Sequence, residues 1–138
     1  MIVKNITYTD FNNVERTEEA CFNLSKTELM KMEYGSAESF SEMVRRIANV
    51  KDTAAIYNLF ENIVLKSYGV KSADGRRLDK SEAVVMEFTQ TSAYDVLMTE
   101  LTSDTQAAVD FIAGILPRDM ADAAREEIAK HELPDTAA

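Results

Sequence analysis

The residues best suited to catalysis are few and lie far apart in the sequence. His131 is the only histidine and Cys21 is the only cysteine. A zinc site draws on about four ligands, mostly of these two kinds, so one of each predicts no zinc site. His131 falls in a weakly patterned C-terminal stretch, where a solvated ring is the better interpretation. Cys21 falls in a predicted strand with no basic cluster beside it in sequence, which favours an inert thiol.

The acidic and glycine-containing patterns give no better catalytic candidate. Residues 74–82 begin and end like a calcium loop but lack its alternating Asp and Asn ligands, so a hairpin turn is favoured. The four glycines form no phosphate-binding loop. Glu18 with Glu19, and Glu126 with Glu127, are sequence neighbours whose side chains point to different faces. We therefore predict a protein that is not an enzyme, with no catalytic residues, no metal and no cofactor.

The methionines point to binding instead. Of the seven methionines in the chain, Met43 and Met98 match the apolar stripes of predicted helices, whereas Met30, Met32, Met86 and Met120 match them less well. Methionine recurs on surfaces that bind varied apolar segments, although it also fills irregular gaps in cores. With two tyrosines from the aromatic-rich region at residues 57–68, the candidate partner-binding residues are Met30, Met32, Tyr57, Tyr68 and Met86.

The composition indicates one soluble, acidic domain. The chain has 138 residues, a net charge of −9 and 46% hydrophobic residues, and a chain of this size buries roughly two-thirds of its unfolded surface. The negative charge disfavours a nucleic-acid partner. No apolar run approaches the ~18 residues of a membrane-spanning helix, and the N-terminus is unlike a signal peptide. We expect an intracellular protein that contacts no membrane, with a globular domain over residues 1–117 and a weakly anchored helix and frayed tail over 118–138.

Local patterns place strands first and helices after them. Residues 2–9 and 14–23 are predicted strands on either side of a polar turn, and the second packs one face near its end, at Phe22. A lone hairpin is marginal in stability, so it must pack on the rest of the chain. The predicted helix caps are Ser25 with Glu28, Ser39 with Glu42, Asp52, Asp79 with Glu82, and Ser103 with Gln106.

Glycine and proline predict where helices end. Gly35 ends the first helix, a left-handed Gly69 ends the helix that follows Asp52, and Pro117 stops the last well-anchored helix. Residues 89–91 break or bend the helical region after the predicted turn at residues 72–76, whose Asp-Gly pair is typical of a hairpin.

These elements predict an α+β fold that is mainly α. It consists of the N-terminal β-hairpin followed by a compact bundle of about five or six short helices, with a small second hairpin near residues 70–78. The predicted core residues are Phe22, Phe40, Ile56, Phe60, Ile63, Leu97 and Phe111.

Several phrases of the sequence, in a fixed order, resemble one protein family. They lie at residues 8–12, 22–29, 66–77, 88–94 and 111–117. In these phrases the chain resembles the tail assembly chaperones of long-tailed, siphovirus-like bacteriophages of Gram-positive hosts. The resemblance covers residues 1–117.

The resemblance implies a role in virion assembly. Such chaperones bind the long tape measure protein in the host cytoplasm and keep it soluble until tail tube subunits polymerise around it, and they are absent from the mature virion. The tail tube protein and a frameshift-extended form of the chaperone are further implied partners. Such an extension would join at residues 118–138.

Two other functions agree with an acidic, helical chain. One is a structural subunit of the tail or of the head–tail joint, which would be found in purified particles. The other is an acidic DNA mimic, which would bind a DNA-binding protein in competition with DNA. The charge is less extreme than a mimic would need, so we rank this function last.

Overall fold

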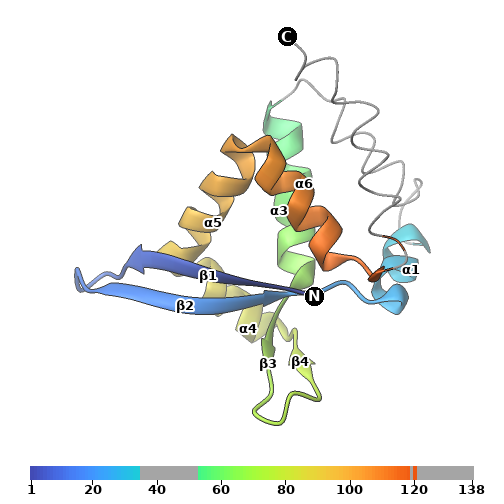
Figure 1. The fold of residues 1–138 in the computed structure, drawn as a ribbon, viewed down its shortest axis with the longest axis horizontal. Helices are drawn as coiled ribbons and strands as arrows, with labels where there is room; N and C mark the ends of the chain where they lie inside the picture. Colours follow the sequence, from blue (N-terminus) through green and yellow to red (C-terminus); the bar gives the residue numbers. More distant parts are fainter. Residues whose placement is uncertain (35–52, 119, 121–138) are drawn as a thin grey trace.

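Figure 1 shows the computed structural model, which describes residues 1–34, 53–118 and 120. In chain order the described elements are β1 (Ile2–Thr9), β2 (Glu15–Phe22), α1 (Lys26–Tyr34), α3 (Thr53–Ser67), β3 (Tyr68–Lys71), β4 (Leu78–Asp79), α4 (Glu82–Thr89), α5 (Ser92–Ser103) and α6 (Thr105–Ile115). The predictions on Gly35, Ser39 with Glu42, Phe40, Met43, Asp52, His131 and the tail lie outside the described residues.

The described strands form one antiparallel sheet in the order β1-β2-β3-β4. β1 and β2 pair along their whole length, from Ile2 opposite Phe22 to Thr9 opposite Glu15. β3 joins the base of this hairpin, where Tyr68 lies opposite Phe22, and β4 pairs with β3. The two predicted hairpins are therefore confirmed, and they are parts of a single sheet.

The predicted mainly α architecture, a compact bundle of five or six short helices, is wrong. The fold is α+β, because β1 and β2 supply a surface that helices cover. α5 and α6 pack against β1, and α3 packs against β2 (Figure 1). Helical periodicity shows that each helix has one apolar face, but it does not say whether another helix or a sheet covers that face.

An aromatic cluster joins the sheet to the helices. Phe22 is fully buried, and its ring centroid lies 5.1 Å from that of Phe111 on α6 and 6.1 Å from that of Phe88 on α4. Phe60 on α3 also contacts Phe111. Of the predicted core residues, Phe22, Phe60, Ile63, Leu97 and Phe111 are confirmed as buried, and the side chain of Ile56 lies outside the description.

Gly69 ends no helix in a left-handed conformation, contrary to the prediction. α3 ends at Ser67, and Gly69 lies inside β3, opposite Cys21. Among the described glycines, Gly75 in the β3–β4 turn has the positive φ, 78°. A β-carbon on Gly69 would lie 2.5 Å from Cγ of Leu78. Glycine at position 69 therefore allows the close approach of a β4 side chain.

Two predicted caps are wrong, since α4 starts without a side-chain cap and α6 is capped by the residue after the predicted one. Asp79 lies in β4, where its Oδ1 accepts a hydrogen bond from the Ser81 N–H (2.9 Å), so α4 starts at Glu82 without a capping box. Ser103 is the last residue of α5. Asp104 instead caps α6, because its Oδ1 accepts hydrogen bonds from two N–H groups of the first turn, at 3.0 and 3.2 Å. Ser and Asp cap about equally well, so composition does not choose between such neighbours.

Three other predicted boundaries are confirmed. Ser25 and Glu28 form a reciprocal capping box at the start of α1, with bonds of 2.9 and 3.1 Å. A break separates α4 from α5 at residues 90–91, and α6 ends before Pro117. These local features set where α1 begins, where α4 gives way to α5 and where α6 ends.

Candidate partner-binding surface

The five candidate partner-binding residues lie on four elements. Met30 and Met32 are on α1, Tyr57 is on α3, Tyr68 begins β3 and Met86 is on α4. Three of the side chains are exposed: Met30 by 51%, Tyr57 by 39% and Met86 by 53%. The structure thus distributes the exposed candidates over three helices and does not gather them at one point.

Tyr68 packs within the aromatic core. Its ring stacks on Phe88, with centroids 4.1 Å apart and planes inclined by 7°, and its centroid lies 5.6 Å from that of Phe22. Burial raises the pKa of the Tyr68 phenol, and the charge of Glu87 adds to the effect. Tyr68 therefore ties β3 to α4 and β2, and a substitution there would act on the fold.

Tyr57 lies on α3, which a side-chain hydrogen bond joins to α5. One turn further along α3, Glu61 accepts a hydrogen bond from the phenol of Tyr94 on α5. Burial raises the pKa of Tyr94, and the bond and charge of Glu61 raise it further. Tyr57 is therefore an exposed residue one turn before the point at which α3 is bonded to α5.

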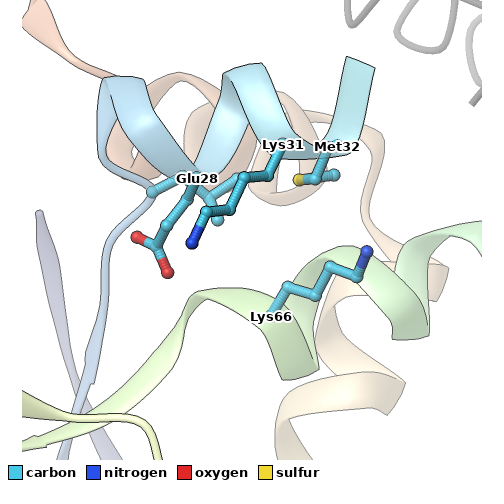
Figure 2. A pocket seen from close by; sticks show the side chains of 5 residues that line it. Glu28, Lys31, Met32 and Lys66 are labelled. Atoms are coloured by element: carbon cyan, nitrogen blue, oxygen red, sulfur yellow. The ribbon is translucent and has the colours of Figure 1, made fainter. Parts of the chain in front are cut away.

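A pocket of about 290 Å³ lies between α1 and the C-terminal end of α3. Leu24 and Met32 give it apolar surface, and Glu28, Lys31 and Lys66 complete its lining. Figure 2 shows the two lysines on opposite sides of the gap between the helices, with Lys31 extending from α1 toward Glu28 and Lys66 extending from α3 toward the side of Met32. Neither lysine forms an ion pair with another described residue. The pocket therefore combines an apolar surface with two available positive charges.

Lys80, just after β4, holds the wall of this pocket in place. Its ammonium group donates to both carboxylate oxygens of Glu28, each at 2.7 Å, and to the backbone carbonyls of Asn23 and Lys66. Burial opposes ionisation of Glu28, but the bonds from Lys80 and Ser25 outweigh it and hold the pKa of Glu28 below its usual value. One cation thus joins the start of α1, the end of α3 and the sheet.

Sequence reasoning identified Met32 but missed the charged residues around it. Lys31, Lys66 and Lys80 each resemble ordinary solvated positions, because no local spacing relates them to one another. Their association arises when α1 docks beside α3, a contact between distant parts of the chain. A basic pair in an otherwise acidic chain becomes visible only in three dimensions.

The described residues offer little to reaction chemistry. Cys21 is buried in β2 between Val3 and Gly69. Within residues 1–34 and 53–118, no three side chains of His, Cys, Asp or Glu are grouped to hold a metal ion. In the same part of the chain, none of the helices has the length and apolar character needed to cross a membrane. The exposed apolar side chains and the pocket are the candidate sites among the described residues.

Comparison with known proteins identifies the family. Searches of curated proteins and of solved structures give no match. A family profile described as phage tail assembly chaperone matches residues 1–138, the whole of the sequence. The match extends beyond residues 8–117, which contain the phrases that suggested the resemblance. It concerns the family and not the host range or the tail morphology. The chain belongs to the family of phage tail assembly chaperones.

Proposed function

We propose that this protein binds the phage tape measure protein in the host cytoplasm and keeps it soluble until the tail tube polymerises around it. The observation that carries the proposal is the family match over residues 1–138, since a chaperone of tail assembly acts on tail proteins. A tape measure protein is long and helical with apolar stretches, so an unassembled copy is prone to aggregate. It is therefore the tail component with the greatest need for such a partner.

The surface supports this proposal in two ways. Met30, Tyr57 and Met86 are exposed apolar side chains on three helices, and flexible methionines adapt to varied apolar segments. The net charge of −9 keeps a complex that covers apolar surface dispersed in solution. Because these side chains lie on three separate helices, they would contact a long apolar partner at separate points along its length.

The complex must also come apart. Tube subunits displace the chaperone during assembly, so binding should be moderate, with a dissociation constant of about 1 µM, or roughly −8 kcal/mol. A surface of separate exposed side chains suits this affinity better than one deep apolar cleft would.

Binding to overlapping fragments of the tape measure protein tests the proposal. The combined variant Met30→Ser, Tyr57→Ser and Met86→Ser should bind at least about tenfold more weakly than the native chain. Val96→Ser is the matched control, because Val96 is also an exposed apolar residue on a helix (40%). It should bind as the native chain does, and all variants should keep the native melting temperature.

Two results would count against the proposal. If the control weakens binding as much as the combined variant, the three side chains are not the contact surface. If the native chain binds no fragment and is found at fixed copy number in purified virions, it is a structural subunit of the tail or head–tail joint.

A further inference from the structure

The pocket between α1 and α3 has a charge opposite to that of the whole chain. The protein has a net charge of −9, yet Lys31 and Lys66 both line the pocket and both are exposed. Glu28 supplies a carboxylate to the lining, but this carboxylate is already paired with Lys80 at 2.7 Å. The charge that the pocket offers to a ligand is therefore that of two lysines.

The ammonium groups of these two lysines do not hold the fold together. Neither group forms an ion pair with another residue in the part of the chain that the structure describes. Lys80 differs, since it is bonded to Glu28 and to two backbone carbonyls. Lysine binds carboxylates through charge-assisted hydrogen bonds, so Lys31 and Lys66 can each accept an anionic group from a ligand.

The pocket also has an apolar wall. Leu24 is buried and Met32 is partly buried against the core. An apolar cavity of roughly 150 Å³ can hold a benzene ring, and the pocket encloses about 290 Å³. It therefore has room for a side chain the size of leucine together with the polar groups beside it. An inorganic anion alone would leave the apolar wall uncovered, so the pocket fits a ligand that is both apolar and negatively charged.

The walls are held by bonds that do not use the two ammonium groups. The N–H of Leu24 donates to the carbonyl of Ile115 at the end of α6 (2.7 Å). Ser25 and Glu28 fix the first turn of α1, and Lys80 donates to the carbonyl of Lys66 at the end of α3 (3.3 Å). A preorganised site loses little conformational entropy when a ligand binds.

The positions of the lysines indicate a ligand with more than one carboxylate. They lie on opposite sides of the gap between the helices, Lys31 extending toward Glu28 and Lys66 toward the side of Met32 (Figure 2). Two carboxylates on either side of an apolar side chain would meet this arrangement, and a protein segment with Asp or Glu flanking a leucine supplies them. A nucleic acid fits less well, because its phosphates would also be repelled by the acidic remainder of the chain.

We propose that the α1–α3 pocket is a docking site for an acidic segment of a partner protein, whose apolar side chain packs against Leu24 and Met32. Carboxylates on either side of that side chain bind Lys31 and Lys66. The contact is small, so the dissociation constant is about 10–100 µM, and binding weakens as salt is raised. This site is separate from the exposed side chains proposed above to contact the tape measure protein, and it does not depend on that function.

Fluorescence anisotropy with a labelled synthetic peptide tests the proposal. The probe is a short peptide with a central leucine and aspartates on both sides of it, titrated with the full chain at an ionic strength of about 0.15 M. One comparison peptide has asparagines in place of the aspartates, and another has serine in place of the leucine. Each should bind at least about fivefold more weakly, because the first lacks the charges and the second lacks the apolar side chain.

Charge reversal in the protein locates the site. Lys31→Glu and Lys66→Glu should each weaken binding of the aspartate peptide about fivefold, and the two together about 25-fold, because they contact different parts of the peptide. Lys71→Glu is the matched control, since it makes the same change in net charge at an exposed position on β3, outside the pocket lining. It should bind as the native chain does, because salt screens distant charges.

Three results would overturn the proposal. One is a native chain that binds the aspartate peptide no more tightly than the asparagine peptide. Another is a loss of affinity in Lys71→Glu as large as in the pocket variants, which would assign binding to net charge alone. The third is tighter binding of a single-stranded oligonucleotide of the same net charge, which would identify the ligand as nucleic acid.

The same peptide separates this proposal from the proposed function. The combined variant Met30→Ser, Tyr57→Ser and Met86→Ser should bind the aspartate peptide as tightly as the native chain, because these side chains lie outside the pocket lining. The pocket variant Lys31→Glu with Lys66→Glu should lose the peptide even if no tape measure fragment binds the native chain. Weaker peptide binding by the combined serine variant would show that the pocket is not a separate site and would overturn the proposal.

Discussion

Replacing Lys80 by Met removes the cation that joins three elements of the fold. The ammonium group donates to Glu28 twice, at 2.7 Å, and to the carbonyls of Asn23 and Lys66. Methionine keeps most of the apolar stem of lysine, which crosses over Gly69, but it offers no donor. The variant therefore isolates the loss of the charge and its hydrogen bonds from a loss of packing.

The expected cost follows from the geometry and the exposure of the pair. Hydrogen bonds to charged groups contribute about 1.5–3 kcal/mol when buried, whereas exposed ion pairs contribute about 0.2–1 kcal/mol. The side chains of Lys80 and Glu28 are 20% and 34% exposed, which places the pair between these limits. We expect a coupling of about 1–2 kcal/mol between Lys80 and Glu28. The total loss for Lys80→Met should be about 2–3 kcal/mol, because two carbonyls also lose a donor.

The coupling should depend on pH in one direction. The pKa of Glu28 is lower in the folded protein than its ordinary value of 4.5, so folding favours the ionised carboxylate. The contribution is therefore complete above the unfolded pKa and is lost as the pH falls through the folded pKa. At acidic pH the difference in stability between the native chain and Lys80→Met should shrink.

A double-mutant cycle with Glu28→Gln measures this coupling by chemical denaturation, first at neutral pH and then at stepwise lower pH. Glutamine preserves the size of Glu28 and its ability to accept a bond from Ser25. A coupling below about 0.5 kcal/mol at neutral pH, or one that stays constant on acidification, would refute the reasoning.

Three further changes test other parts of the fold by their effect on the free energy of unfolding. Gly69→Ala should destabilise the protein by about 1–2 kcal/mol, because the new methyl group would meet Leu78 at 2.5 Å. Adding Leu78→Ala should recover part of this loss. If stability does not recover, that contact is not the cause of the loss. Asp104→Ala should cost about 1 kcal/mol, since Asp104 caps α6, while Ser103→Ala should cost less than about 0.5 kcal/mol. A larger loss for Ser103→Ala than for Asp104→Ala would show that Ser103 is the capping residue. Phe60→Ala should cost about 3–5 kcal/mol at this 2% exposed position, and a loss under about 1 kcal/mol would contradict its place in the core.

Local elements were largely predictable because their causes are local. Ser25 and Glu28 specify the start of α1 through bonds only three residues apart in the chain. Pro117 ends α6 because it has no N–H to donate. The apolar faces of α5 and α6 likewise follow from spacing alone, which is why Leu97 and Phe111 were correctly assigned to the core.

The arrangement of those elements was not predictable, because it depends on contacts between distant residues. Gly69 carries the same local pattern whether it ends a helix or lies in a strand, and only its pairing with Cys21 decides. Once β3 joins β2, the hairpins become one sheet, and the helices pack on this sheet as well as on one another. The same long-range docking creates the pocket at Lys31 and Lys66, so local pattern could not reveal it.

The amount of tape measure protein that stays in solution is the most direct test of the central claim. The tape measure protein should be expressed alone, with this chain, and with the combined Met30→Ser, Tyr57→Ser and Met86→Ser variant, and its soluble fraction measured after ultracentrifugation. We predict that it is insoluble alone, soluble with the native chain and mostly insoluble with the variant. A tape measure protein that is equally soluble without this chain would contradict the chaperone function.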